Sequence, residues 1–276
     1  MSQSHLSTQR TNLHKPEIKS VVSPKKKLRN ILIVLIILSL YTFSSIQTSS
    51  FLTQFNAEFF QNVGRMIGKM WPPRIGFASA VWPKLAETIH MAVIGTTIAC
   101  IFCLPLSVLA ANNINQNKYL YSTTKFLLNV LRTIPELLLA VIFVSLVGIG
   151  VFPGILALTF FSLGILAKLL SETIESIDMS QVEAMRASGG NTIQVIRFAV
   201  LPQILPQFTS FSLYVFEINI RASVVLGFVG AGGIGLLLNQ QIAFFNYKNA
   251  MALTLIIYVV VVSIDYISNK IREALL

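Results

Sequence analysis

The sequence predicts an all-α integral membrane protein with six transmembrane helices and with both termini in the cytoplasm. The first observation is composition: 54% of the 276 residues are hydrophobic and only 12% are charged, against about 25% charged residues in soluble proteins. The second is that the apolar residues form long unbroken runs, which favours helices over the alternating pattern of a membrane β-barrel. These observations exclude a water-soluble globule, a collagen-like chain and a disordered chain.

Six apolar runs supply the predicted spans, since a helix needs about 20 predominantly apolar residues to cross a membrane. They cover residues 31–46, 85–111, 126–151, 153–174, 204–228 and 250–267. The first run is short and follows a basic stretch, so a cleaved signal peptide is the alternative to a retained helix. Its long polar leader, and the lack of a small-residue cleavage site after it, favour the retained helix.

The same runs divide the chain into parts. We expect a basic cytoplasmic leader (1–29), a first transmembrane helix (30–48), an extracytoplasmic or interfacial segment (49–84), and a core domain with five helices (85–276). The longest polar interruption of the core, residues 175–203, is expected to be a cytoplasmic loop. The predicted location is a bacterial cytoplasmic membrane.

The basic residues set the orientation. The net charge is +10, and much of it lies in the leader, which suits contact with anionic lipid under the positive-inside rule. No nucleic-acid-binding motif accompanies it, so no nucleic-acid partner is predicted. With the amino terminus inside, the inner side also holds Lys118, Lys125, Arg186, Arg197, Lys270 and Arg272. The outer side holds only Arg65, Lys69, Arg74, Lys84 and Lys248.

The loop 175–203 carries an apolar stripe. Apolar residues recur there at spacings of three and four, which predicts two short amphipathic helices: Val182, Met185, Ile193, Ile196 and Val200. Gly189 and Gly190 are expected to form the hinge between the helices, and Pro202 is expected to end the second one. A cytoplasmic loop with apolar stripes needs a partner that buries them.

The spacing of this loop resembles the EAA loop of ABC importer permeases. That family has Glu-Ala-Ala, three residues, Gly, nine residues, Ile, one residue and Leu-Pro, and the matching residues are Glu183, Ala184, Met185, Gly189, Ala199, Leu201 and Pro202. Two of them, Met185 and Ala199, depart from the pattern but stay apolar. The resemblance implies that Arg186 and Gly190, together with these residues, dock on an ATP-hydrolysing subunit. A helix pair lying on the membrane surface is the alternative.

Two further stretches narrow the resemblance. Residues 216–223 and 226–235 closely resemble phosphonate ABC transporter permeases, and the segment 132–137 also occurs in that group and its relatives. The resemblance implies the transmembrane domain of a type I ABC importer that carries phosphonate or a related phosphorus oxyanion such as phosphite. Methionine and osmoprotectant permeases are the alternatives within the family.

The resemblance also implies the partners. Two copies of the permease would pair around the path, two ABC ATPase subunits would dock on the loops, and an extracytoplasmic phosphonate-binding protein would deliver the substrate. ATP and Mg would be used by the partner ATPase. This chain itself would hold no catalytic residue, cofactor or metal.

Charged residues within the spans are the candidates for the substrate path, because each one is costly in lipid. Glu217 and Arg221 lie four residues apart on the fifth span, so they can form a helical ion pair or place Arg221 toward an oxyanion. Arg132 and Glu136 repeat this spacing on the third span, where Pro135 predicts a kink. The candidate path residues are Arg221, Glu217, Asn219, Ser223, Arg132 and Glu136.

The glycine run after the fifth span is expected to form a tight re-entrant or extracytoplasmic turn. Its glycines are Gly230, Gly232, Gly233 and Gly235. They satisfy the dinucleotide-binding pattern, but no strand precedes them and no acidic residue follows at the required distance. Close packing of the backbone is the favoured reading, and an anion-binding nest of amide N–H groups is the alternative.

Other chemistry is sparse. Cys100 and Cys103 lie inside an apolar helix and read as inert thiols, and the three histidines do not cluster. An ion-coupled secondary carrier is the rival outside the family. It would require internal repeats and a cluster of intramembrane carboxylates, and neither is visible.

Overall fold

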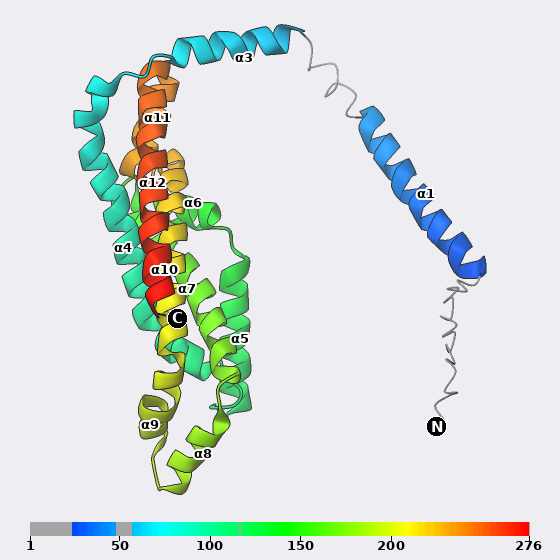
Figure 1. Ribbon diagram of the computed structural model, residues 1–276, viewed down its shortest axis with the longest axis vertical. Coiled ribbons are helices and arrows are strands. Elements are labelled where there is room, and N and C mark those ends of the chain that lie inside the picture. Colours follow the sequence, from blue (N-terminus) through cyan, green and yellow to red (C-terminus); the bar gives the residue numbers. More distant parts are fainter. Residues whose placement is uncertain (1–23, 48–56, 116, 276) are drawn as a thin grey trace, which may run out of the picture. The chain divides into compact units, whose positions relative to one another are not determined.

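The computed structural model describes residues 24–47, 57–115 and 117–275. Every regular element within these ranges is helical (Figure 1), which confirms the predicted all-α fold. The elements are α1 (Pro24–Gln47), α3 (Ala57–Met70), η1 (Ile75–Phe77), α4 (Ala78–Leu109), α5 (Lys118–Thr133), α6 (Glu136–Val147), α7 (Val151–Glu175), α8 (Met179–Ala187), α9 (Thr192–Val195), the π-helix η2 (Ile196–Val200), α10 (Leu201–Leu226), η3 (Gly227–Val229), α11 (Gly233–Ala243) and α12 (Tyr247–Leu275). Most of the predicted leader lies outside the described residues.

The chain divides into two compact units, Met1–Arg65 and Met66–Leu276. The first unit contains α1, which begins at Pro24, a residue whose missing amide N–H is tolerated in the first turn of a helix. Its segment Lys26–Ile46 is apolar and long enough to cross a membrane. Its apolar side chains are exposed along the whole helix, as expected of a helix surrounded by lipid.

Helix α7 is the centre of the second unit, where it packs against α4, α5, α6 and α10. Small residues bring these helices together. Gly164 of α7 lies against the α5 backbone at Arg132, and Gly95 of α4 lies against Leu158. Small residues at contacts are typical of membrane helices, because lipid supplies no hydrophobic force between them and close packing must hold them instead.

The predicted spans correspond to the long helices. Among the described residues, five helices are long and apolar enough to cross a membrane, and the pair α5 and α6 makes a sixth if it is counted as one span. Some helices are longer than the apolar runs from which the spans were predicted. Helix α4, for example, begins at Ala78, seven residues before the predicted boundary at residue 85.

The third predicted span is not one straight helix, since α5 and α6 meet at an angle of 89°. Ile134 and Pro135 between them are extended, because a proline disfavours the α conformation of the residue before it. Arg132 and Glu136 therefore lie on different helices and form no ion pair among the described residues. The kink predicted at Pro135 is confirmed, and it divides the third predicted span into two helices.

Different elements lie at the two ends of the second unit. Helices α8 and α9 project from one end of the bundle, whereas the start of α4 and the connection from α11 to α12 lie at the other end (Figure 1). With the orientation predicted from the basic residues, α8 and α9 face the cytoplasm.

Candidate functional site

Helix α8 is capped at its N-terminus and packed against the helix bundle. Asp178 caps its N-terminus by accepting hydrogen bonds from the backbone N–H and the hydroxyl of Ser180, at 2.9 and 2.6 Å. Val182 is fully buried in a core formed by the C-terminal halves of α4 and α7 and the N-terminal half of α10, so it fixes the helix to the bundle. Glu183 and Arg186 are exposed and form no ion pair among the described residues.

A glycine hinge follows α8, as predicted. Gly189 has φ +83°, a left-handed conformation that L side chains rarely adopt. The amide of Gly190 donates to the Met185 carbonyl at 3.0 Å, and a Cβ at Gly190 would collide with that carbonyl. The pair thus closes α8 and reverses the chain within a few residues.

Helix α9 begins with a capping box, in which the side chain of Asn191 accepts from the Gln194 amide and the Gln194 side chain accepts from the Asn191 amide. It continues through the π-helix η2 into α10 without a break. Pro202 lies in the first turn of α10, so the prediction that it ends the second short helix was wrong. Pro202 directly follows the π-helical turn η2, where the regular hydrogen-bond pattern of the α-helix is already interrupted.

Gln203 joins the start of α8 to α10, and this role was not predicted from the sequence. Its side-chain amide donates to the carbonyl oxygens of Ala199, at 2.7 Å, and Asp178, at 3.3 Å. Its side-chain oxygen accepts from the Asp178 amide at 3.0 Å. The start of α8 is therefore tied directly to α10.

The structure gathers the predicted coupling residues into one projecting element. Their role in docking an ATPase stays a prediction. Helix α8 carries Glu183, Ala184, Met185 and Arg186. The hinge is Gly189 and Gly190, and the start of α10 carries Leu201 and Pro202. We call residues 178–203 the coupling element below.

The Asp178 cap gives the coupling element a predicted pH dependence. The Ser180 hydroxyl and amide lower the pKa of Asp178 below its ordinary value of 3.8. A lowered folded pKa means that the stabilisation is complete above pH 3.8 and is lost as the pH falls through the folded pKa. Hydrogen exchange of the first α8 amides is expected to accelerate over that acidic range. Asp178→Asn, which keeps the cap without a titrating group, should remove the acid dependence; an unchanged profile would contradict this account.

A network of four charged residues links α10 to α12. The Glu217 carboxylate accepts from Arg221 and from Arg272, each at 2.6 Å, and Arg221 also pairs with Asp265 at 3.1 Å. The predicted pair of Glu217 and Arg221 is thus present, while Asp265 and Arg272 could not be assigned to it from the sequence because they lie far along the chain. Arg221 is held by two carboxylates rather than presented alone.

Asn219 and Ser223, two other candidates for the path, are fully buried. Asn219 donates to the hydroxyls of Thr96, at 2.8 Å, and Ser162, at 2.6 Å, which joins α10 to α4 and α7. Ser223 donates to the Ile220 carbonyl of its own helix. Asn219 thus links three helices in this conformation, whereas Ser223 bonds only within α10, and the part of both in the path stays a prediction.

Arg132 is a different kind of charge. It is exposed at the end of α5, beside the 89° bend, and forms no ion pair among the described residues. Glu136, in the first turn of α6, is half-buried and likewise unpaired within that part of the chain. The bend therefore leaves a guanidinium group without a protein counter-ion.

The glycine run forms the break between α10 and α11. A Cβ at Gly235 would overlap the Val224 carbonyl oxygen, and a Cβ at Gly227 would meet the Leu236 amide, so these backbones touch directly. The carbonyl of Gly230, a residue with φ +93°, accepts from the Gly150 amide at 3.0 Å. Close packing is thus the observed role of the turn.

Two amide groups at the start of α11 already have protein acceptors. Ile234 donates to the Thr88 hydroxyl at 2.8 Å, and Gly233 donates to the Glu87 carboxylate at 3.3 Å. A carboxylate at the N-terminus of α11 is favourable for the helix dipole. In place of the external anion expected for an anion-binding nest, the Glu87 carboxylate of the protein itself accepts from this turn.

Comparisons with known proteins agree with this arrangement. Residues 103–275 match the family described as the binding-protein-dependent transport system inner membrane component. The phosphite transport system permease protein PtxC of Stutzerimonas stutzeri is 39% identical over 213 residues, which cover 77% of each chain. The putative cryptic phosphonate transport system permease protein PhnE2 of Escherichia coli is 44% identical over 118 residues, covering 43% of this chain and 97% of that protein.

The fold is also found in a solved structure. A chain of the MetNI methionine ABC transporter in an inward-facing conformation superimposes with a TM-score of 0.62 at 23% identity, over 71% of this chain and 96% of that one. This likeness shows the fold of a type I ABC importer transmembrane domain. The family's members are transport subunits of the inner membrane that work with a separate ATPase. The chain therefore belongs to the binding-protein-dependent permeases of ABC importers, as a multi-pass protein of the inner membrane.

Proposed function

We propose that this chain forms the translocation path of an ATP-driven importer for phosphonate or a related phosphorus oxyanion such as phosphite. The observation that carries the mechanism is the coupling element, a hinged pair of helices that projects from the bundle and is tied to α10 through Gln203. The substrate class is supported by the 39% identity to a phosphite permease and by the 44% identity to a putative phosphonate permease.

The partners follow from the family. Two copies of this chain would pair around the path, and two ABC ATPase subunits would each receive one coupling element. ATP and Mg would be bound by those subunits alone, and an extracytoplasmic binding protein would deliver the substrate. The exposed Glu183 and Arg186 would fix the register of docking, since opposite charges on a short helix suit recognition in a groove.

Motion would pass from the ATPases to the path through the backbone. When ATP draws the ATPase subunits together, each coupling element moves with them. Because α9, η2 and α10 form one continuous helical segment, this displacement reaches the intramembrane part of α10 without a flexible joint. Such coupling requires two conformations whose populations nucleotide shifts differently.

The charge of the substrate is matched by Arg132. An anion crossing the membrane needs a compensating cation, and a guanidinium group binds phosphoryl oxygens in a bidentate manner. Arg132 is exposed and unpaired among the described residues, whereas Arg221 is engaged by Glu217 and Asp265. We therefore expect the substrate to meet Arg132, with Arg221 available only if its network opens.

Transport by the reconstituted complex tests the function. Proteoliposomes containing this permease, its ATPase and its binding protein would be supplied in turn with methylphosphonate, phosphite, methionine and glycine betaine. We expect uptake of the phosphorus oxyanions that requires ATP on the ATPase side. Uptake of methionine or betaine instead would contradict the substrate class. Uptake by the permease alone along an ion gradient would favour a secondary carrier.

The hinge provides the test of coupling. Gly189→Val places a β-branched residue at φ +83°, at a strain of about 1–3 kcal/mol. Roughly each 1.4 kcal/mol corresponds to a tenfold change in an equilibrium, so ATP-driven uptake is expected to fall about tenfold while the protein still inserts. Gly189→Asn is the matched control, because asparagine tolerates the left-handed conformation. Equal loss in both variants would show that the backbone conformation is not what matters.

A further inference from the structure

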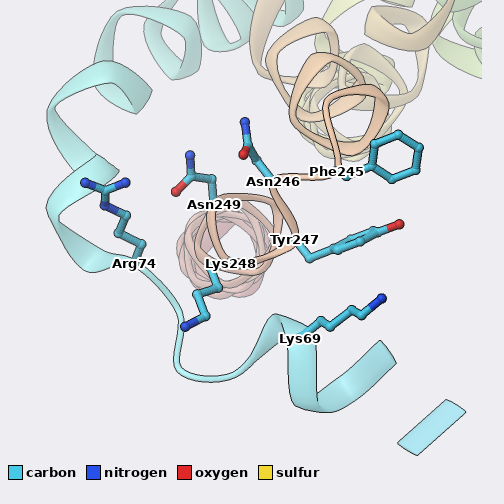
Figure 2. Close-up of a pocket in the computed structure, with 7 residues that line it drawn as sticks. All are labelled: Lys69, Arg74, Phe245, Asn246, Tyr247, Lys248 and Asn249. Carbon is cyan, nitrogen blue, oxygen red and sulfur yellow. The ribbon is translucent and has the colours of Figure 1, made fainter. Parts of the chain in front are cut away.

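A pocket of about 710 Å³ opens at the end of the bundle opposite the coupling element. It is lined by the end of α3, the segment before α4, and the connection from α11 to α12. The lining residues are Lys69, Arg74, Phe245, Asn246, Tyr247, Lys248 and Asn249 (Figure 2). The lining contains three cations and no carboxylate.

The three cations lack protein counter-ions. Lys69, Arg74 and Lys248 form no ion pair among the described residues, although ion pairs neutralise Lys84, Lys125, Lys168, Arg221 and Arg272 elsewhere in the second unit. The pocket therefore concentrates uncompensated positive charge where the positive-inside rule predicts little of it. Such a site calls for an anionic ligand.

The pocket is held open by the backbone. The Arg74 amide donates to the Lys248 carbonyl at 3.2 Å, which joins the segment before α4 to the start of α12. Phe245 has φ +59°, a left-handed conformation that is unusual for a bulky residue and that occurs often at ligand sites. Figure 2 shows Arg74 and Lys248 on one side of the start of α12 and Lys69 beside Tyr247 on another. The charges are thus spread over a wide opening.

The surroundings place the pocket at the level of lipid headgroups. Trp71, Trp82 and Phe245 are 65%, 63% and 74% exposed. Exposed tryptophan and other aromatic residues gather at the membrane–water interface, where one part of the ring meets lipid and the other meets water. Met66 and Ile67, just before Lys69 on α3, are also exposed and apolar, which suits a helix that lies in the interface.

We propose that this pocket binds a phosphate group at the extracytoplasmic surface of the inner membrane. A cationic pocket at headgroup level suits the phosphodiester of an anionic phospholipid such as phosphatidylglycerol. The spread of its cations suits a headgroup with several oxygens, and the neighbouring apolar surface would accept the acyl chains. A free phosphorus oxyanion offers the same chemistry, and the experiment below separates the two sources. The inference does not depend on which solute the permease carries.

Tryptophan fluorescence supplies the readout, because the chain has two tryptophans, Trp71 just after α3 and Trp82 near the start of α4, and both are close in sequence to the pocket. The full chain would be reconstituted in mixed bilayers with brominated phosphatidylglycerol or brominated phosphatidylcholine, whose bromines quench nearby tryptophan. We expect phosphatidylglycerol to be preferred on the order of tenfold. The triple variant Lys69→Gln, Arg74→Gln, Lys248→Gln should lose this preference. Free phosphate would be scored in detergent by phosphorus NMR line broadening, again against the triple variant.

Controls keep the outcome interpretable. Lys118→Gln, Arg197→Gln, Lys270→Gln removes the same charge on the predicted cytoplasmic side and should leave the preference intact. Arg74→Lys with Lys248→Arg keeps the charges and should also retain it, which separates loss of binding from loss of folding. A lipid preference identifies the headgroup as the ligand, and line broadening without a lipid preference identifies a free anion. The proposal is overturned if neither signal depends on the three cations.

Discussion

Glu217→Gln is expected to destabilise the folded permease by about 3 kcal/mol or more. The Glu217 side chain is only 12% exposed and accepts from both Arg221 and Arg272. Removing one partner of a buried ion pair leaves uncompensated charge in a medium of low polarity, which is far costlier than losing a surface pair. Because the network joins α10 to α12, the loss should separate these two helices first. Thermal or denaturant unfolding in detergent measures the effect.

Lys168→Gln is the matched control. Lys168 pairs with Glu172 at 2.8 Å, and the carboxylate that this variant leaves unpaired is 53% exposed to solvent, so the loss is expected to stay below about 1 kcal/mol. In the double variant Glu217→Gln, Arg272→Gln, part of the lost stability should return, since one stranded charge is also removed. Similar unfolding curves for the two single variants would refute the structural role of the network.

Gly235→Ala is expected to prevent stable assembly of α10 with α11. The new Cβ would overlap the Val224 carbonyl oxygen, and neither atom can move aside because the backbone fixes the positions of both. Relief requires that the two helices separate, which would also strain the bonds from Ile234 and Gly233 to Thr88 and Glu87. We expect a loss of about 3 kcal/mol or more, seen as reduced yield and an earlier unfolding transition.

Gly68→Ala is the control for this second prediction. Gly68 lies within α3, and its added Cβ would meet no atom within 4 Å. Alanine also favours the helix over glycine by about 0.5–1 kcal/mol. The control should therefore be neutral or slightly stabilising. Wild-type stability of Gly235→Ala would show that the turn has room to relax and that close packing does not explain its glycines.

The coupling element shows what a local pattern can specify. Apolar residues at spacings of three and four, a glycine pair and the position of Glu183 were enough to predict a helix, a hinge and a second helix, and α8, Gly189–Gly190 and α9 occupy those positions. Each of these features is set by neighbours within a few residues. The end of the second helix was missed because a proline is compatible both with a stop and with the first turn of a new helix.

The candidate path shows where such reasoning stops. Pro135 predicted a kink between Arg132 and Glu136, but not that the chain turns by 89° there and places the two residues on separate helices. The pair of Glu217 and Arg221 was predicted from its spacing, but its extension to Asp265 and the burial of Asn219 and Ser223 were not. The partners of Asn219 and Arg221 are Thr96, Ser162 and Asp265, which lie on other helices.

The sequence by itself determined the class of protein and the family, and it predicted six spans and their orientation. These depend on composition, on the length of apolar runs and on short motifs, and all of them are readable along one chain. Only the tertiary structure decided that Glu87 and Thr88 fill the amides of the glycine turn, that Gln203 ties α8 to α10, and that Lys69, Arg74 and Lys248 share one pocket. The reason is physical: these contacts join residues far apart in the chain, and their partners are chosen by helix packing, which no local spacing encodes.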